Sequence, residues 1–396
     1  MKIVEATLWP LQIPFAESFA HSAQSRAASD SIVVRLKAAD GTVGYGEVVA
    51  RPYVTGETVS GCLEFISEVL WPAIAAADYS LPPAIGSLEA ENLDWLETIA
   101  ATLPAGNLPP GTGTIAWTAA CAGLELALID CLLKQQQRSL ASLLPPKRTT
   151  VTYSGAITTG SLETAIKRAK TYQLFGLTQM KVKLLGDLQA DCDRIAAIRE
   201  AVGSKVTLRM DGNGAYDLDG AIALCRSLDS LKIDAAEQLL PRGDLSAWTA
   251  LTAASPIAIA VDESLVTVSD ARELIAANAC HCFNLRIAKC GGLVRSLEMV
   301  RIACTAGISL HLGCHVGETA ILSAAGRHLA AYLDGLVFVE GSYSTLLLAE
   351  DISQESLHFG HGGRANLLRR PGLGIAVQDA VLERYATRRI DLEGQS

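Results

Sequence analysis

Residues 179–212 read QMKVKLLGDLQADCDRIAAIREAVGSKVTLRMDG and hold two short apolar runs, 179–185 and 206–212, on either side of an amphipathic window at 191–201. Both runs contain β-branched residues, and a charged side chain closes each of them, Lys183 in the first and Asp211 in the second. A strand, a helix and a second strand in this order predict a parallel βαβ unit.

The same alternation continues on both sides of this unit. Six more strand-like runs bring the total to eight, at 150–157, 233–238, 257–263, 283–289, 308–314 and 335–341. Further helical windows lie between them, at 162–175, 218–228, 270–277 and 293–306. One marker near each strand end gives intervals of 28, 26, 25, 27, 24 and 26 residues, for Lys183, Asp211, Glu237, Asp262, Lys289, Gly313 and Val339. A period this regular predicts a (β/α)8-type barrel.

The rest of the chain does not show the strand–helix alternation of the predicted barrel. Residues 1–60 are strand-like, and helical patterns follow at 58–78, 86–103 and 116–137, interrupted by a Pro/Gly-rich stretch at 104–113. We therefore expect an α/β fold in which the barrel carries an N-terminal α+β capping domain that the C-terminal segment completes. The expected boundaries are 1–145 for the capping domain, 146–355 for the barrel and 356–396 for the segment that packs back on the cap.

Composition excludes several classes of protein. Of the 396 residues, 49% are hydrophobic and 19% charged, which is typical of a globular chain and excludes a disordered protein or a coiled coil. The 33 Lys and Arg residues against 42 Asp and Glu residues give a net charge of −9, without a basic run. Nucleic acid is therefore not an expected partner.

Signals for export and for membranes are not apparent. The N-terminal stretch MKIVEATLWPLQIPF alternates like a strand, and we find no apolar stretch of the ~18 residues that a membrane span needs. The ten cysteines include no CxxC pair and lie mostly in apolar runs, which favours buried free thiols over disulfides or a zinc site. We expect a cytoplasmic protein with no membrane partner.

Charged residues close five consecutive strands of the predicted barrel. In order, these residues are Lys183, Asp211, Glu237, Asp262 and Lys289. Catalytic residues of such barrels lie at the C-terminal ends of the strands, so three carboxylates should converge at the mouth between two lysines. Their mutual repulsion would be relieved by a hard divalent cation such as Mg²⁺. Two lysines on opposite faces of a bound carbon suit removal and return of a proton next to a carboxylate, with the metal stabilising the enediolate.

The motifs around these residues resemble those of the enolase superfamily. They are Lys181-Val182-Lys183, Asp211-Gly212-Asn213, Glu237-Gln238, Asp262-Glu263-Ser264 and Lys289-Cys290-Gly291-Gly292. The first and last are typical of its muconate lactonizing enzyme subgroup, which comprises muconate cycloisomerases, dipeptide epimerases, o-succinylbenzoate synthases and N-acyl amino acid racemases. The stretches 43–47 (VGYGE) and 53–58 (YVTGET) are similar to the capping domain of the same family.

The resemblance implies a role for each motif residue. Asp211, Glu237 and Asp262 would bind Mg²⁺, with Mn²⁺ as an alternative ion. Lys183 and Lys289 would be the acid/base pair. Lys181 would be an electrostatic partner of Lys183. Asn213 and Glu263 would position the metal site and Lys289. Glu318 would reach the substrate carboxylate or a lysine.

Two loops of the cap should close over the barrel mouth, at 15–28 and 50–57. Phe19, His21 and Arg26 in the first loop are candidates for contacts with the distal part of the substrate. Arg51 and Tyr53 in the second loop are the favoured pair of substrate-binding residues.

Three departures from the family pattern affect the prediction. The loop after Glu237 is longer than usual, because Pro241 does not follow Gln238 directly. Arg286 stands where many members have lysine, and we expect it on the strand interior or outer face, without effect on the assignment of the acid/base pair. The last strand ends in 339–343 (VEGSY), with one acid in place of the Asp-x-Asp pair that often holds the amino group of a dipeptide. This difference does not favour an Ala-Glu dipeptide as the substrate.

The function predicted first is a Mg²⁺-dependent isomerase that acts on a small carboxylate, as an epimerase or racemase of a dipeptide or N-acyl amino acid. A muconate-type cycloisomerase or an o-succinylbenzoate synthase-type dehydratase is the alternative, since either needs only one lysine as acid or base. A non-catalytic barrel and a phosphate-binding barrel enzyme are alternatives from other classes. Family members commonly self-associate, so a homo-oligomer is expected.

Overall fold

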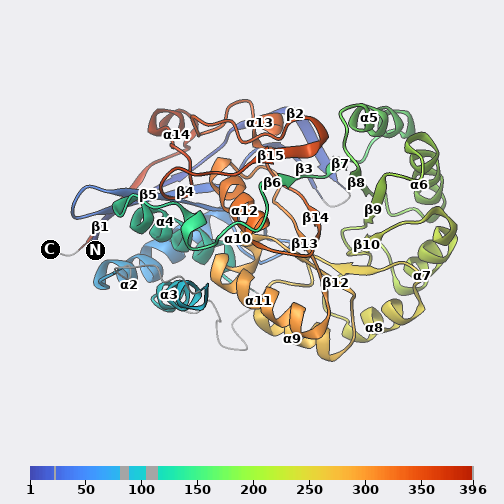
Figure 1. Cartoon of the computed structure of the whole chain (residues 1–396), viewed down its shortest axis with the longest axis horizontal. Helices are drawn as coiled ribbons and strands as arrows, with labels where there is room; N and C mark the ends of the chain where they lie inside the picture. The colour runs from blue at the N-terminus through green and yellow to red at the C-terminus, as the bar shows by residue number, and fades with distance from the viewer. Residues whose placement is uncertain (22–23, 81–88, 104–114, 395–396) are drawn as a thin grey trace.

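The computed structural model describes residues 1–21, 24–80, 89–103 and 115–394. Two bodies make up the molecule, a barrel surrounded by helices and a cap of strands and helices beside it (Figure 1). The expected (β/α)8-type barrel with an α+β cap is confirmed, and eight parallel strands follow one another around the sheet in chain order.

Each strand of the barrel pairs with the next one along the chain. Alternate residues of a strand point to the same face, so 179, 181 and 183 of β8 lie on one face of the sheet together with their partners 207, 209 and 211 of β9. The register places Lys181 beside Arg209 and Lys183 beside Asp211. The strands are β7 (Gly155–Ile157), β8 (Gln179–Lys183), β9 (Thr207–Asp211), β10 (Ala235–Glu237), β11 (Ile259–Val261), β12 (Cys282–Leu285), β13 (Ser309–Leu312) and β14 (Leu336–Val339).

The two ends of the curled sheet meet at Ser154. Its amide N–H donates to the carbonyl of Val339, 2.9 Å away, at the end of β14. The sequence predicted a single strand over 150–157, and this prediction is wrong. The first part of this run, β6 (Thr150–Thr152), pairs instead with β15 (Arg364–Asn366), so the chain changes partners at this point.

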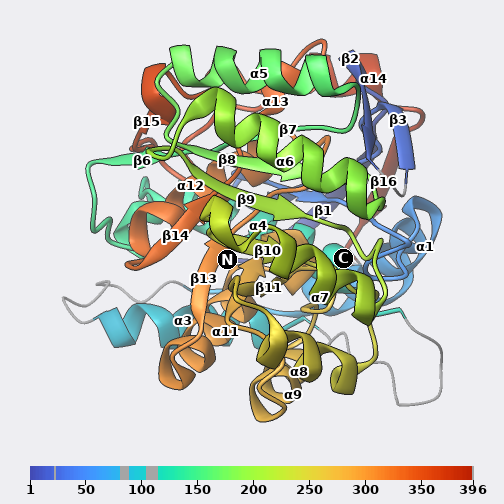
Figure 2. The ribbon, with the colours of Figure 1, turned by 90° about the vertical axis from the view of Figure 1, so that its right-hand side faces the viewer.

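The helices of the barrel lie outside the strands (Figure 2). Each of the helices α5 to α9 begins after a Ser, Asp or Thr whose side chain accepts a hydrogen bond from a backbone N–H of the first turn. Such a cap defines the start of a helix. The capping residues are Ser161, Asp187, Asp217, Asp244 and Thr267. The helices around the barrel are α5 (Leu162–Leu174), α6 (Leu188–Val202), α7 (Leu218–Ser227), η3 (Asp229–Leu231), α8 (Leu245–Ala254), α9 (Val268–Ala276), α10 (Ile287–Cys290), α11 (Leu293–Ala306), α12 (Ala320–Tyr332) and α13 (Ser344–Leu347).

The predicted strand 283–289 ends earlier than expected. β12 stops at Leu285, and Lys289 lies in the single helical turn of α10. Gly291 and Gly292 follow with φ values of 89° and 115°, which favour glycine, and they turn the chain into α11. A Cβ on Gly292 would lie 2.3 Å from a carboxylate oxygen of Glu125, which accepts the N–H of Leu293 at the start of α11. A residue of the cap therefore packs against this turn of the barrel.

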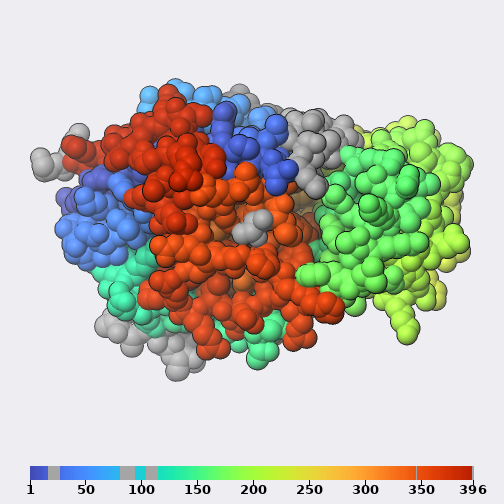
Figure 3. All heavy atoms as spheres, turned by 90° about the horizontal axis from the view of Figure 1, so that it is seen from above, coloured from blue at the N-terminus to red at the C-terminus, as the bar shows by residue number. Residues whose placement is uncertain are grey.

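An antiparallel sheet of four strands forms the centre of the cap. Its order is β16-β1-β4-β5, so the last strand of the chain pairs with the first and both termini lie at the same end of the molecule (Figure 1). The segment that follows β14 also covers the junction of cap and barrel (Figure 3). The elements are β1 (Ile3–Pro10), β2 (Pro14–His21), β3 (Gln24–Ala28), β4 (Ile32–Ala38), β5 (Val43–Val48), α4 (Thr118–Gln135), η2 (Leu140–Ser142), η4 (His361–Gly363), α14 (Asp379–Tyr385) and β16 (Ile390–Glu393).

The remaining helices of the cap pack beside α4. They are α1 (Val59–Phe65), the π-helical turn η1 (Ile66–Leu70), α2 (Trp71–Ala76) and α3 (Glu89–Ala101). In the part of the chain that the structure describes, Val59–Ala76 is the one helical stretch long and apolar enough to span a membrane, with a mean hydropathy of 1.3. Two glutamates interrupt the apolar residues of this stretch. Glu64 and Glu68 are exposed on this stretch while Ile66 and Leu70 are buried, as in an amphipathic helix on a protein core.

Candidate active site

Three fully buried carboxylates lie at the ends of neighbouring strands. Asp211 ends β9, Glu237 ends β10, and Asp262 directly follows β11. The register places Asp211 between Lys183 and Glu237, so these three side chains lie at one level of the barrel. The sequence spacing predicted this convergence, because parallel strands end at the same edge of a sheet.

Both lysines of β8 contact these carboxylates. The ammonium of Lys183 donates to Asp211 Oδ2 at 2.6 Å and to Asn213 Oδ1 at 2.7 Å. Lys181 lies deeper, with its Nζ 3.1 Å from Asp211 Oδ2 and 3.3 Å from Glu237 Oε1. Lys183 therefore faces the barrel mouth, whereas Lys181 compensates charge beneath it.

A second layer of buried charges lies below the three carboxylates. Arg209 pairs with Glu237 at 2.8 Å and with Glu340, and Lys181 donates to Glu340 Oε2 at 2.8 Å. Sequence reasoning did not find Arg209, although its place two residues before Asp211 puts it on the inward face of β9. Asn284 was also missed, and its amide donates to Glu237 Oε1 at 2.8 Å.

Arg286 is the main correction to the predicted site. It was expected in the interior of the strand or on its outer face, but it follows the end of β12, and its guanidinium contacts Asp262 and comes within 4.0 Å of Glu237 Oε1. Lys289 donates to the other oxygen of the same carboxylate, at 2.8 Å. It also donates to the backbone carbonyls of Asp262 and Asn284. Arg286 reaches the site because β12 ends one residue before it, which turns its side chain toward Asp262.

Asn213 and Glu263 connect the ends of β9 and β11. The amide of Asn213 donates to Glu263 Oε1 at 3.0 Å, and Asn213 adopts a left-handed φ of 46°. Gln238, which sequence reasoning cited only as a motif residue, accepts the backbone N–H of Asp262 at 2.9 Å. Gln238 therefore fixes the backbone of one of the three carboxylates.

Burial and neighbouring cations act in opposite directions on these acids. Burial raises the pKa of Asp211, Glu237 and Asp262, but the adjacent lysines and arginines outweigh it and lower each pKa, that of Glu237 to about 2. Burial also acts to lower the pKa of Lys181, and its carboxylate neighbours raise it above the ordinary value. These groups are therefore held in their charged forms.

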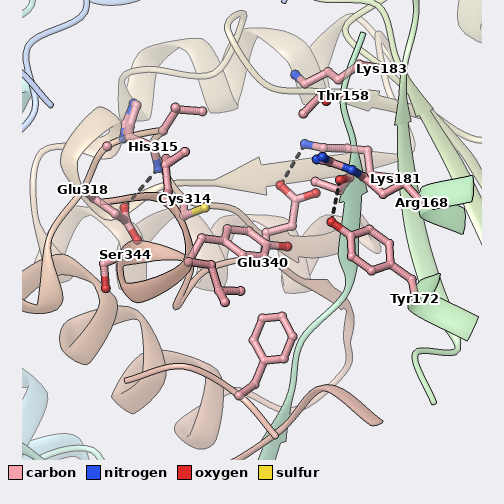
Figure 4. A pocket seen from close by; sticks show the side chains of 18 of the residues that line it. Thr158, Arg168, Tyr172, Lys181, Lys183, Cys314, His315, Glu318, Glu340 and Ser344 are labelled. Atoms are coloured by element: carbon pink, nitrogen blue, oxygen red, sulfur yellow. Dashed lines mark hydrogen bonds and ion pairs between the residues drawn. The ribbon is translucent and has the colours of Figure 1, made fainter. Parts of the chain in front are cut away.

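A cavity of about 420 Å³ opens beside this cluster (Figure 4). Lys183, Asn213, Glu263 and Arg286 line it. Glu318 lines it as well, across the cavity from Lys183. Lys289 is fully buried and is not one of the lining residues described. Burial, reinforced by the Glu47 carboxylate, raises the pKa of Glu318 to about 8, and burial with Asp262 nearby raises that of Glu263 to about 7.

The cap contributes one of its two predicted residues to the cavity wall. Tyr53 lines the cavity and is 40% exposed. Arg51 lies behind the wall, where its buried guanidinium donates to the Val316 carbonyl at 2.6 Å and pairs with Asp30 at 2.9 Å. Arg51 thus holds the loop that carries Glu318 and is not placed to touch a substrate. The side chains of Phe19, His21 and Arg26 lie outside the described residues.

The donor set fits a hard divalent cation. All three strand-end ligands are carboxylates, the oxygen donors that Mg²⁺ prefers, and the neighbouring Glu263 has a buried oxygen, Oε2, without a hydrogen-bond partner. Among the residues that the structure describes, no three Asp, Glu, His or Cys side chains are grouped closely enough to hold an ion. Each of the three carboxylates instead contacts a cation: Asp211 pairs with Lys183, Glu237 with Arg209, and Asp262 with Arg286 and Lys289.

Comparison with known proteins identifies the family. A family model described as "Enolase C-terminal domain-like" matches residues 164–381, more than half of the chain. The chain belongs to the enolase superfamily. Its relatives place it in the muconate lactonizing enzyme subgroup of that superfamily, and it is accordingly an isomerase. Membership implies use of Mg²⁺.

Relatives in this superfamily include both epimerases and cycloisomerases. L-Lys-D/L-Arg epimerase from Methylococcus capsulatus is 31% identical over 386 residues, which cover 96% of this chain and 100% of that protein. Muconate cycloisomerase 1 from Pseudomonas putida is 30% identical over 361 residues, 90% of each protein.

Solved structures of the superfamily extend over almost the whole chain. N-succinyl Arg/Lys racemase from Bacillus cereus has a TM-score of 0.87 at 25% identity, covering 99% of this chain and 100% of that one. A dipeptide epimerase from Enterococcus faecalis, complexed with Mg and L-Leu-L-Tyr, has a TM-score of 0.80 at 28% identity and covers 95% of this chain and 100% of its own.

Proposed function

We propose that this enzyme is a Mg²⁺-dependent epimerase or racemase that removes and returns the proton next to the carboxylate of a dipeptide or an N-acyl amino acid. The observation that carries the proposal is Lys183, on the cavity wall and 2.6 Å from the first of three buried strand-end carboxylates. An amine beside a site for a substrate carboxylate is placed to act on the neighbouring carbon. The epimerases and racemases among the relatives support the same reaction class.

Asp211, Glu237 and Asp262 are the proposed ligands of Mg²⁺, with Mn²⁺ as an alternative. The bound ion would supply positive charge next to the substrate carboxylate, which favours loss of the adjacent proton. Lys181 would hold its charge beneath the ligands, Asn213 and Glu263 would orient Lys183, and Glu318 and Tyr53 would contact the substrate.

Lys183 and Lys289 lie at the two ends of the row of carboxylates, on Asp211 and Asp262 respectively. This placement suits a base on each face of a bound carbon, which inversion of a stereocentre requires. Lys289 reaches the substrate only if it gives up hydrogen bonds to the carbonyls of Asp262 and Asn284.

A cycloisomerase or dehydratase is the second candidate. The observation that favours it is that Lys183 lines the cavity while Lys289 is buried behind it, so one lysine is directly available. The similarity to a muconate cycloisomerase points the same way.

The test is a mass-spectrometric screen of dipeptides and N-acyl amino acids in D₂O with Mg²⁺. We expect one deuteron at the α-carbon of a defined substrate, and its loss in Lys183→Ala and in an EDTA-treated sample. With two bases, Lys183→Ala and Lys289→Ala should each abolish exchange with one enantiomer only. If protein shown to bind Mg²⁺ exchanges no member of the screen, the epimerase proposal is wrong, and muconates and succinylbenzoate precursors become the substrates to test.

We further infer that the enzyme acts in the cytoplasm as a homo-oligomer. None of the ten cysteines, all of which the structure describes, forms a disulfide, and most are buried, which suits a reducing compartment. Light scattering after size-exclusion chromatography should give a multiple of 41.8 kDa, and a mass equal to one chain would contradict the inference.

A further inference from the structure

The cavity extends from the carboxylate cluster along the seam between β14 and β7. Helix α13, which follows β14, has only four residues, whereas α5 to α9, α11 and α12 have 9 to 15. The flank of α5 is therefore left partly uncovered. We call this extension the apolar arm, and its walls are Tyr172, Phe175, Leu177, Tyr343, Leu347 and Phe359.

The aromatic walls of the apolar arm are held in place with their polar atoms satisfied elsewhere. The hydroxyl of Tyr172 donates to the Ala156 carbonyl at 3.1 Å, and that of Tyr343 donates to the Ser154 carbonyl. Phe359 lies edge-on to Tyr343, with ring centroids 5.9 Å apart. The arm therefore presents carbon surface, which binds apolar groups by excluding water.

The inner end of the apolar arm is unfavourable for a substrate ammonium group. Glu340 is the carboxylate there, and both Lys181 and Arg209 already pair with it. Arg168 lines the same side of the cavity (Figure 4). The carboxylate at the inner end is thus already paired with two cations before any substrate binds. Glu318 lies on the opposite side, beside His315.

We propose that the apolar arm binds an uncharged apolar acyl group, aryl or branched alkyl, at the end of the substrate remote from the reacting carboxylate. The preferred substrates are then N-acyl amino acids, and dipeptides with a free N-terminal ammonium are poor ones. This inference rests on the proposed function, because it takes the substrate carboxylate to lie at Asp211, Glu237 and Asp262.

The experiment compares three derivatives of the same L-amino acid, with phenylacetyl, succinyl or glycyl on the nitrogen. We measure kcat/KM for α-deuterium exchange in D₂O with Mg²⁺, on alanine and again on phenylalanine. The phenylacetyl compound should exceed both others by about tenfold or more, the scale of discrimination that an apolar pocket provides. A faster succinyl compound would assign the site to an anion through Arg168, and a faster glycyl compound would assign it to a cation; either result overturns the proposal.

If none of the three compounds exchanges its α-proton, the proposed function is wrong, but binding of an apolar acyl group in the apolar arm is not yet refuted. Calorimetric binding to the Mg²⁺-loaded protein then decides: tighter binding of the phenylacetyl compound supports the apolar arm, and equal or weaker binding overturns it.

Two substitutions localise the effect. Leu347→Lys puts a cation on the wall of the apolar arm and should shift the succinyl-to-phenylacetyl ratio of kcat/KM upward by about tenfold or more. Leu174→Lys adds the same charge at a residue that is 85% exposed and outside the described cavity wall, and it should leave the ratio unchanged. If Leu347→Lys misfolds by thermal unfolding, Phe175→Ser, at a 40% exposed wall position, should lower the phenylacetyl preference. An unchanged ratio in the folded wall variant overturns the proposal.

Discussion

Among single residues, Arg286 tests how the cations around the three carboxylates contribute to stability. It is nearly buried and contacts the carboxylate of Asp262. Arg286→Met should lower the free energy of unfolding by ~3 kcal/mol in EDTA, because a buried carboxylate loses a partner. The loss should be smaller with Mg²⁺, which supplies the missing charge and binds the folded state. Urea denaturation with EDTA and with Mg²⁺ measures both effects.

Arg272→Met is the matched control, since Arg272 is 67% exposed in a surface pair with Glu298. It should change stability by less than ~1 kcal/mol in either condition. Equal losses with and without Mg²⁺ for Arg286→Met would show that Arg286 does not act through the ligand carboxylates.

Glu318 should make stability depend on pH. Burial raises its pKa to about 8 in the folded protein, above the ordinary value of 4.5. The folded state then binds more protons between about pH 4.5 and 8, so the contribution of Glu318 to stability falls as pH rises through that window. Glu318→Gln should therefore gain stability relative to the natural chain from pH 5 to pH 8, on the order of a few kcal/mol. Urea denaturation at several pH values measures this difference.

The exposed Glu64, substituted by Gln, is the control for this comparison and should give a difference that does not vary with pH. A constant difference for Glu318→Gln as well would mean that Glu318 is ionised throughout the range.

At the scale of elements, the closest packing in the cap joins α4 to β5. A Cβ on Gly46 would lie 1.8 Å from the backbone carbonyl oxygen of Gly123, and a backbone atom cannot move aside as a flexible side chain can. Gly46→Ala should therefore cost at least ~3 kcal/mol in the free energy of unfolding or prevent folding. Gly326→Ala is the matched variant, since Gly326 lies in α12 with open space around its Cβ position. It should be neutral or stabilise by up to ~1 kcal/mol. Similar losses for the two variants in thermal unfolding would refute the packing argument.

Helices with a local cause were predicted more closely than segments with a distant partner. Asp187 and Asp217 lie next to the helices they cap; the window predicted at 218–228 begins where α7 does, whereas the window at 191–201 begins three residues after the start of α6. The division of 150–157 depends on β15, more than 200 residues further along the chain. The turn from α10 into α11 likewise involves Glu125 of the cap, which accepts the N–H of Leu293 at the start of α11. Neither partner can be read from the pattern of the segment itself.

At the scale of the whole molecule, the C-terminal segment completes the cap. β16 pairs with β1, and Val381 and Leu382 of α14 are buried in the core. A chain ending at Gln378 loses both elements and should fail to fold, because it leaves the sheet with an open edge and an uncovered apolar face. A chain ending at Gly394 keeps them and should unfold like the full protein. Circular dichroism and solubility measure the outcome, and a stable chain ending at Gln378 would contradict this role.

The sequence by itself determined the barrel, the cap and the convergence of Asp211, Glu237 and Asp262, because strand periodicity and a repeat of about 26 residues are local properties that place strand ends at one edge. Only the tertiary structure decided which cations contact these carboxylates. Arg286 and Lys289 both meet Asp262, Arg209 and Lys181 share Glu340, and Arg51 turns away from the cavity. The direction of a long charged side chain depends on the charges that other strands bring near it, and no single segment specifies those.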